Sequence, residues 1–423
     1  MRNTIGSRSK RILCQPMLCV GVALASFILV LPARAQSRVA NPQTDIAGVV
    51  QADQFTPVVV SPLAETTTPV LGTDGKYHVV YELTFSNARP VTATLKRIAV
   101  LDAETPAKSI AAYEGGELLA RLRTLGNTAA SSPEIEFNGA RLFLIHLAFD
   151  SQADVPRRLL HHVELLGASG AAPEPTLTPS SYTVTPFPLD ARLPVVGPPL
   201  TGKGWVAANG CCDADGVHRK TVLPVNGRLY IAQRYAIDWM RLDEAGRLVH
   251  GDPSDVHSYP SYGDDILAVA DGSVVSTLNI LDDQTPGALP DPKTITVENV
   301  DGNHVVLDLG NGFFAFYAHM QKGSVAVRPG DRVKRGQVLG KLGNSGNTSA
   351  PHLHFHIMNG PSVLGSDGLP YVIDHFQLAG QISKERFAAA EGVEGNWSQG
   401  LFANPSPRQN QFPLDLTIVD FLR

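Results

Sequence analysis

The sequence has little cysteine, little net charge and one long apolar run. Its 423 residues include four cysteines, and 35 Lys and Arg nearly balance 40 Asp and Glu, for a formal net charge of −5. A charged fraction of 18% beside 43% hydrophobic residues excludes a disordered chain, and the lack of a basic excess excludes a nucleic-acid coat protein. After the N-terminal segment no stretch approaches the roughly 18 apolar residues of a spanning helix, so we expect no later membrane span.

The one long apolar run lies at the N-terminus. Basic residues up to Arg11 precede an apolar stretch over 17–31, and Ala33-Arg34-Ala35 follows it. This order is typical of a secretory signal peptide that is cut after Ala35. An uncleaved anchor is the alternative, because the apolar stretch is long for a signal. We therefore predict a signal peptide over 1–35 and a periplasmic or secreted protein.

Signal removal would leave only two cysteines, the adjacent Cys211 and Cys212. Neighbouring cysteines rarely bridge each other without strain, and two cysteines make no disulfide framework. We predict a buried or weakly strained loop pair. A metal role is the weaker alternative, because no C-x-x-C partner is present.

The length predicts two or three domains at roughly 100 to 200 residues each. Glycine (38) and proline (31) are frequent, which favours short strands and turns over long helical bundles. Over 36–170, β-branched and alternating runs such as 77–85 and 140–149 recur with turn signals between them. This pattern predicts an N-terminal domain that is an antiparallel β-sandwich.

Four histidines of this region share no ligand spacing: His78, His146, His161 and His162. Lone histidines in strands are more often satisfied or solvent-facing than ligands, so the pattern predicts no metal site here. The following segment, 171–201, is rich in Pro, Thr and Ser and predicts an extended linker. A second domain then begins near Gly202.

The second domain carries three histidines on one short segment. Turn residues over 343–351 lead into 352–356, where His352, His354 and His356 alternate with apolar residues and therefore share one face of a predicted strand. Neighbours on that face lie about 6.6 Å apart and the outer pair about 13 Å, so one metal ion cannot bind all three. One or two can be ligands and another can act as a base. A solvated histidine-rich strand is the alternative.

Five short motifs follow one another between 268 and 358: Ala268-Val269-Ala270-Asp271-Gly272, Tyr317-Ala318-His319-Met320, Gly330-Asp331 with Val333 and Gly336-Gln337, Gly343-Asn344-Ser345-Gly346-Asn347, and Pro351-His352-Leu353-His354-Phe355. In content and order they resemble the LytM/lysostaphin-type zinc peptidase family. The resemblance covers residues 202–360 and implies an antiparallel β-sheet domain. It also implies a secreted or periplasmic enzyme that cuts peptide bonds in peptidoglycan. The chain is thus expected to be mainly β, with a β-rich extension over 361–423.

The resemblance also implies site residues. The family's Zn²⁺ is held by an H-x-x-x-D motif and the second histidine of an H-x-H motif, which gives Asp238 and His354 here. His319 and His352 match the family's catalytic histidines. Their implied roles are to orient or deprotonate a water molecule and to stabilise the tetrahedral intermediate.

The sequence departs from the family at the first ligand, because the position four residues before Asp238 is Arg234. Arginine stays protonated and cannot bind zinc. We predict His218 as the replacement, at the start of a strand that turns at Asn226-Gly227. A two-residue turn places it opposite Tyr235, and a bulge or a longer loop places it opposite Arg234. Weaker candidates are His250, His257 and Asn209.

Two further residues are predicted to support the site without binding the metal. These are Arg234 and His356, which stands where the family usually has Glu. A solvent-facing His356 is the alternative.

The predicted function is an exported zinc metalloendopeptidase with a peptidoglycan or peptide substrate and no nucleic-acid partner. A degenerate module that binds cell wall or regulates another wall hydrolase is the alternative, which Arg234 favours and the retained histidines oppose. A lipoyl-type carrier, suggested by the hairpin around Lys334, would leave the histidines unexplained. The N-terminal domain is expected to position the hydrolase domain or to bind a partner protein.

Overall fold

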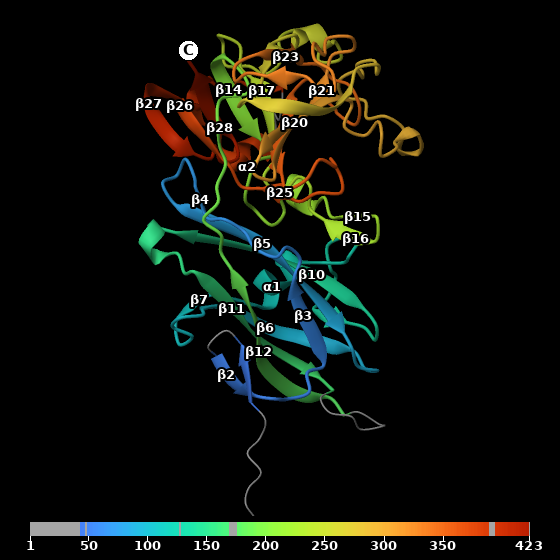
Figure 1. The fold of residues 1–423 in the computed structure, drawn as a ribbon, viewed down its shortest axis with the longest axis vertical. Coiled ribbons are helices and arrows are strands. Elements are labelled where there is room, and N and C mark those ends of the chain that lie inside the picture. Colours follow the sequence, from blue (N-terminus) through green and yellow to red (C-terminus); the bar gives the residue numbers. More distant parts are fainter. Residues whose placement is uncertain (1–42, 47–48, 127, 169–175, 389–393, 423) are drawn as a thin grey trace, which may run out of the picture. The chain divides into compact units, whose positions relative to one another are not determined.

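The computed structural model describes residues 43–46, 49–126, 128–168, 176–388 and 394–422 (Figure 1). The predicted signal peptide over 1–35 lies outside these residues. Within the described part, no helix is both long enough and apolar enough to cross a membrane. Residues Gln43–Arg423 form one unit, in which strands far outnumber helices.

The N-terminal half consists of two five-stranded antiparallel sheets. The first has the order β3 (Val58–Pro62), β5 (Tyr77–Asn87), β10 (Ala140–Phe149) and β8 (Leu122–Arg123), with β4 (Val70–Leu71) on β5. The second has the order β12 (Thr178–Pro188), β11 (Arg158–Gly167), β6 (Ala93–Asp102) and β7 (Ser109–Glu114), with β9 (Glu134–Ile135) on β6. Side chains of both sheets, such as Tyr81 and Val163, share one apolar core. The predicted β-sandwich is confirmed.

Strand β12 lies inside the segment 171–201 that was predicted as a linker, so this prediction is wrong for Thr178–Pro188. The strand pairs with β11 on both sides of one register shift and buries Tyr182 and Phe187 in the sandwich core. Two inward aromatic side chains and this strand pairing outweigh a composition that is typical of linkers.

The second half is built on a twelve-stranded sheet. Its order is β13 (Val195–Val196), β26 (Val372–Gln381), β28 (Thr417–Phe421), β14 (Gly202–Ala208), β17 (Ile237–Arg241), β24 (Leu353–Met358), β21 (Phe313–Met320), β20 (Asn303–Gly310), β19 (Gly272–Leu278) and β22 (Arg332–Val333), with β25 (Gly368–Leu369) on β24 and β27 (Leu401–Gln411) on β26. Among the described pairings of this sheet, only β13 with β26 is parallel. The predicted extension over 361–423 thus supplies strands of the same sheet.

The remaining elements are short. They are the strand pairs β1 (Gln43–Ile46) with β2 (Val49–Ala52), β15 (Leu223–Val225) with β16 (Arg228–Tyr230) and β18 (Asp265–Leu267) with β23 (Val338–Lys341), the helices α1 (Gly115–Arg121) and α2 (Lys384–Arg386), and the 3₁₀ turns η1 (Gln152–Asp154), η2 (His218–Lys220), η3 (Val256–Ser258), η4 (Pro292–Thr294) and η7 (Ser398–Gly400).

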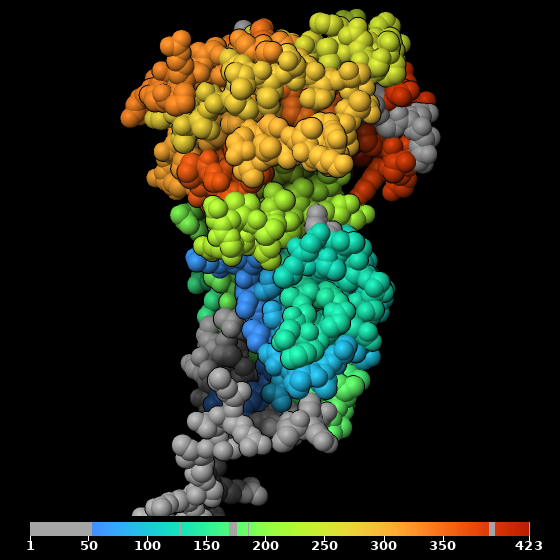
Figure 2. Space-filling model, turned by 90° about the vertical axis from the view of Figure 1, so that its right-hand side faces the viewer, coloured from blue at the N-terminus to red at the C-terminus, as the bar shows by residue number. Residues whose placement is uncertain are grey.

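The outer face of the first sandwich sheet is buried against the second half of the chain. Along β5, Tyr81 points into the sandwich core, whereas its neighbour Val80 belongs to the core of the twelve-stranded sheet. On β10, Leu144 packs in the same way against Val222 and Ile231. Residues that follow 200, in yellow-green, lie directly against blue and teal residues of the sandwich (Figure 2). Because side chains alternate along a strand, β5 and β10 bury both faces.

A fully buried carboxylate lies in this contact. Glu82, on β5, is 0% exposed, and its oxygens lie 3.1 Å from Nη2 of Arg219 and 2.8 Å from Nη2 of Arg234. Arg234 also lies 3.2 Å from Asp367 and donates to the Gly368 carbonyl oxygen at 3.0 Å. Burying one ionised group without partners is costly, so Glu82 and the two arginines depend on one another.

We expect Glu82→Gln to lower the free energy of unfolding of the full chain by about 3 kcal/mol or more, because it leaves two buried guanidinium groups without their shared carboxylate. Denaturant unfolding would measure the change. Glu136→Gln is the matched control, since the Glu136 side chain is 62% exposed and its pair with Arg141 should contribute less than about 1 kcal/mol. Equal effects of the two substitutions would contradict this account.

Candidate functional site

His218 lies in η2 and not in a strand. The turn at Asn226-Gly227 is confirmed, since Leu223 pairs with Tyr230 and Val225 with Arg228, but the hairpin begins only at Leu223. The predicted position of His218 in a strand, opposite Tyr235 or Arg234, is therefore wrong. The strand pairing does not extend back to His218 because the backbone turns between 218 and 222. In this turn the Thr221 hydroxyl donates to the His218 carbonyl oxygen at 2.6 Å.

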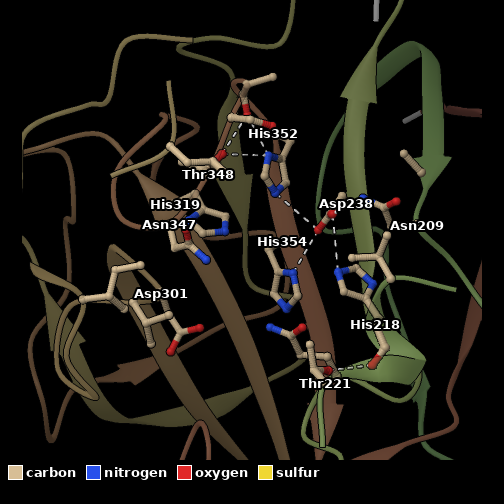
Figure 3. A pocket seen from close by; sticks show the side chains of 18 of the residues that line it. Asn209, His218, Thr221, Asp238, Asp301, His319, Asn347, Thr348, His352 and His354 are labelled. Carbon is tan, nitrogen blue, oxygen red and sulfur yellow. Dashed lines mark hydrogen bonds and ion pairs between the residues drawn. The ribbon is translucent and has the colours of Figure 1, made fainter. Parts of the chain in front are cut away.

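The structure nevertheless brings His218 to Asp238 and His354 (Figure 3). Asp238 and His354 lie directly opposite each other on β17 and β24. His218 Nε2 is 3.4 Å from Asp238 Oδ2, and His354 Nδ1 is 2.9 Å from Asp238 Oδ1. All three residues are buried, and one possible ligand atom of each lies within 4.8 Å of the others. Two imidazoles and a carboxylate are a donor set that Zn²⁺ accepts, with a fourth position left open.

His319 and His352 lie beside this cluster. His319 is near the end of β21, His352 precedes β24, and their ring centroids are 4.7 Å apart. His352 Nε2 is 3.3 Å from Asp238 Oδ1. His319 has a φ of +61°, which is uncommon for a residue other than glycine, and hydrogen bonds of its backbone to Asp301 and Gly343 hold it there. His218, His319, His352 and His354 thus lie together around Asp238.

Backbone carbonyl groups set the proton positions of three imidazoles. Nδ1 lies 3.0 Å from the Ala236 carbonyl oxygen in His218, 2.8 Å from that of Ser345 in His319, and 2.7 Å from that of Ala350 in His352. A carbonyl oxygen can only accept a hydrogen bond, so each Nδ1 carries a proton, and Nε2 is the nitrogen that has a lone pair when the ring is neutral. Burial disfavours the charged form of His218 and His352, but the Asp238 carboxylate outweighs this effect and raises their pKa. Such bonds orient histidines that bind metals.

His354 has the opposite orientation, and His356 accounts for it. His354 Nε2 is 3.0 Å from His356 Nδ1, which leaves His354 Nδ1 facing Asp238. His356 is 0% exposed, which excludes the solvent-facing alternative. Its ring contacts a proposed ligand and not the carboxylate of Asp238.

The weaker ligand candidates do not join the cluster. His250 and His257 are exposed. Asn209 donates from Nδ2 to Asp238 Oδ2 at 2.7 Å, so it holds the carboxylate. Arg234 directs its guanidinium to Glu82 and Asp367.

Burial and the neighbouring charges determine which groups are ionised. Burial disfavours the Asp238 carboxylate, but the imidazoles of His218 and His352 outweigh this effect and hold its pKa well below the usual range. Burial lowers the pKa of His354 to about 4 and that of His319 well below its usual value. Near neutral pH these two rings are therefore uncharged and can offer lone pairs.

The site opens into a cleft of about 660 Å³. Besides the histidines and Asp238, its lining includes Leu289, Ile295, Val297 and the buried carboxyl group of Asp301. Burial raises the pKa of Asp301 to about 7. Asp301 was not predicted from the sequence, because a single Asp in a turn-rich segment has no recognisable spacing to other site residues.

Comparison with known proteins agrees with the motifs. Residues 256–364 match the model of Peptidase family M23. The predicted resemblance to LytM/lysostaphin-type peptidases is thereby confirmed for this M23 segment, which contains His319, His352 and His354 and begins after His218 and Asp238.

Two curated relatives come from Vibrio cholerae serotype O1. Peptidoglycan DD-endopeptidase ShyA is 40% identical over 57 residues, which cover 14% of this chain and 13% of the relative. Peptidoglycan DD-endopeptidase ShyC is 39% identical over 112 residues, which cover 25% of this chain and 24% of the relative. The chain thus spans a quarter or less of these relatives. Among solved structures, the catalytic domain of lysostaphin from Staphylococcus simulans is 21% identical, with 40% of this chain and 88% of that chain covered and a TM-score of 0.22.

We expect Asp301→Asn to stabilise the metal-free protein at pH 8 but not at pH 4. A pKa raised from 3.8 to about 7 gives stability that is complete below pH 3.8 and is lost as the pH rises to 7. The loss is about 4 kcal/mol at the most, and an amide, which does not titrate, avoids it. Thermal unfolding of both proteins at the two pH values measures the difference in Tm. A difference that does not change with pH would contradict the raised pKa.

Proposed function

We propose that this chain is an exported zinc-dependent metalloendopeptidase that hydrolyses peptide bonds in peptidoglycan cross-links. The observation that carries the proposal is the convergence of His218, Asp238 and His354 beside His319 and His352, at the wall of an open cleft. The family match of the M23 segment supports the reaction class. The names of the two Vibrio relatives, both peptidoglycan DD-endopeptidases, support the substrate. Export rests on the predicted signal peptide over 1–35.

The residues of the cluster fit a zinc ion. His218 through Nε2, Asp238 through its carboxylate and His354 through Nδ1 would hold it, and each of the two rings has its other nitrogen engaged by Ala236 or His356. Bound zinc supplies Lewis acidity, which lowers the pKa of a water molecule toward about 7 and polarises the scissile carbonyl group. Asn209 would keep Asp238 in place through its hydrogen bond of 2.7 Å.

His319 and His352 would handle the proton and the developing charge. Both line the cleft, and in both Nδ1 is engaged by a backbone carbonyl oxygen, so Nε2 is the nitrogen available for proton transfer. One Nε2 accepts a proton from the attacking water, and the resulting imidazolium then donates to the leaving amine. The other ring orients the water and the tetrahedral oxyanion.

A catalytically degenerate module that binds cell wall or regulates another hydrolase is the second candidate. The observation that favours it is Arg234 in the place of the first zinc histidine of the family. In that case the cluster would hold no metal or would hold it without turnover.

Zinc content separates the two candidates. We expect purified wild type to contain stoichiometric zinc. His218→Ala and His354→Ala should lower the zinc affinity by at least about tenfold, because removal of a residue that only hydrogen-bonds to a metal ligand already lowers metal affinity by that factor. His250→Ala, at an exposed histidine outside the cluster, is the control and should keep its zinc. Elemental analysis and chelator competition measure both.

Zinc that persists in His218→Ala would refute His218 as a ligand. Wild type that contains no zinc would refute the proposed zinc-dependent peptidase activity. Zinc-loaded wild type that releases no fragments from purified peptidoglycan, while the binding of peptidoglycan persists, would support the degenerate module.

A further inference from the structure

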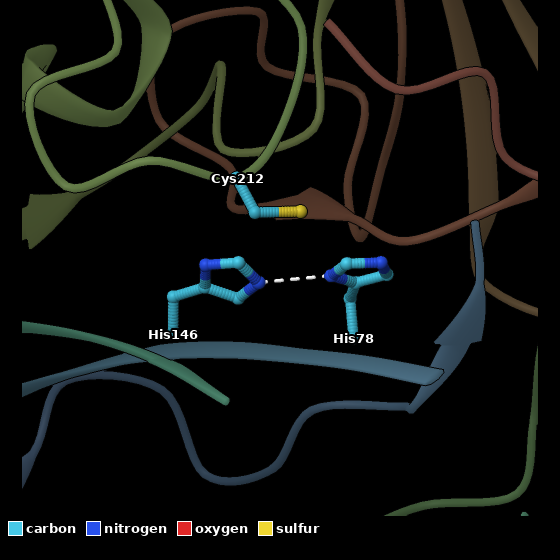
Figure 4. A group of neighbouring side chains, drawn as sticks. All are labelled: His78, His146 and Cys212. Atoms are coloured by element: carbon cyan, nitrogen blue, oxygen red, sulfur yellow. Dashed lines mark hydrogen bonds between the residues drawn. The ribbon is translucent and has the colours of Figure 1, made fainter. Parts of the chain in front are cut away.

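A second group of metal-binding side chains lies outside the cleft (Figure 4). His78 on β5 and His146 on β10 share the sheet face that the second half of the chain covers. His78 Nδ1 and His146 Nε2 are 2.8 Å apart. Cys212, which follows β14, lies over both rings, and one possible ligand atom of each residue lies within 4.8 Å of the others. Two imidazoles from one domain and a sulfur atom from the other thus converge.

The proton positions suit ligation by His78. Its Nε2 is 3.0 Å from Asp74 Oδ1, so the N–H group donates to the carboxylate and Nδ1 keeps a lone pair toward His146. A carboxylate that accepts from the second nitrogen is the usual partner of a histidine that binds a metal. The mutual hydrogen bond of the rings places the proton of His146 on Nε2, and transfer of that proton to Nδ1 would free a second lone pair.

Most of the group is buried. His78 is 4% exposed and Cys212 is 6% exposed, and His146 is half-buried. Burial lowers the pKa of His146 to about 4, so its ring is neutral at neutral pH. A neutral imidazole is available as a ligand and does not have to lose a proton first.

In this structure the sulfur of Cys212 is bonded to Cys211. The expectation that these neighbours rarely bridge is therefore wrong for this chain, although both are buried as predicted. A disulfide sulfur is a poor ligand, whereas a thiolate binds zinc strongly. The state of the disulfide would therefore decide whether the group offers two donors or three.

We propose that His78, His146 and Cys212 form a second metal site, which binds Zn²⁺ once a dithiol reductant has opened the Cys211–Cys212 disulfide. The dithiol supplies two electrons and two protons and becomes a cyclic disulfide, and both cysteines become thiols. When the metal binds, the Cys212 thiol releases one proton to solvent, and the His146 proton moves from Nε2 to Nδ1. The ion then links the sandwich, through its two histidines, to the domain that carries the cleft.

Cobalt spectroscopy tests the site on the full chain. Wild type is treated with dithiothreitol, desalted without oxygen and titrated with Co²⁺. We expect a thiolate-to-cobalt charge-transfer absorption in the near ultraviolet and a further equivalent of bound metal, relative to the unreduced protein. The cleft cluster offers only nitrogen and oxygen ligands, so this absorption reports a thiolate outside the cleft and is independent of the proposed function. The variants below show whether that thiolate is Cys212.

Two cysteine variants form a matched pair. Cys211→Ser leaves Cys212 as a free thiol and should show the absorption without any reductant. Cys212→Ser removes the ligand and should not show it under either condition. His146→Ala should lower the Co²⁺ affinity of the reduced protein by at least about tenfold. Near-ultraviolet circular dichroism before the metal is added identifies any variant that has failed to fold.

Two outcomes would overturn the proposal. One is a reduced wild type and a folded Cys211→Ser variant that both lack the absorption. The other is an absorption that keeps its strength and affinity in a folded His146→Ala variant, because it would then arise from the thiol alone.

Discussion

Glu82 is the buried charge around which the two halves of the chain are arranged. It is a carboxylate in the middle of an apolar strand, and it can be ionised there only because Arg219 and Arg234 reach it from the other half. Arg219 pairs with this carboxylate, whereas Arg234 pairs with both Glu82 and Asp367. Arg219 directly follows His218, and Arg234 precedes Asp238 by four residues. The segments that carry two of the three proposed zinc ligands are therefore fixed by a charge in the sandwich. The first sandwich sheet, which carries Glu82 on β5, thus helps to position the residues of the cleft.

The same network explains why Arg234 can stand where related peptidases have a histidine. Its guanidinium is engaged by Glu82, Asp367 and the Gly368 carbonyl oxygen, so this position has a different physical task in this chain. In the proposed site His218 takes the place of that imidazole, on a 3₁₀ turn that Arg219 ties to the sandwich. The residue at 234 is then used for the contact between the two halves, and the proposed ligand comes from another segment. Buried Arg234 and nearby His218 are consistent with a zinc ligand that comes from another segment. A site that had only lost its function would not require Glu82, the buried carboxylate that pairs with Arg234.

The sequence predicted those parts of the fold and the site that depend on local patterns. Alternation identified the sandwich strands, Asn226-Gly227 identified a hairpin with the correct register, and the H-x-H spacing placed His352 and His354 near one strand. The sequence did not predict features that depend on contacts between residues far apart in the chain. Strand β12 was hidden by a linker-like composition, since only pairing with β11 reveals which side chains face the core. His78 and His146 showed no common spacing because a strand register, not a sequence interval, brings them together. A glutamate in an apolar strand, such as Glu82, indicates a buried ionic partner, but its sequence position does not identify Arg219 and Arg234 as the partners.

The main chain controls the chemistry of the cleft. Three of its imidazoles donate Nδ1 to a carbonyl oxygen, each from a different segment: Ala236 next to β17, Ser345 in the turn-rich stretch over 343–351, and Ala350 just before β24. A side-chain partner could be replaced by mutation and could itself titrate, whereas a carbonyl oxygen does neither. The protons on the three Nδ1 atoms therefore stay in place as long as the backbone of these segments is held. That backbone is held by the strand pairing of the sheet, by the left-handed conformation at His319 and, through Arg219 and Arg234, by Glu82. The protonation of Nδ1 that the proposed metal site needs is in this way a consequence of the fold, and in that proposal His218 completes the site from a turn outside the strands.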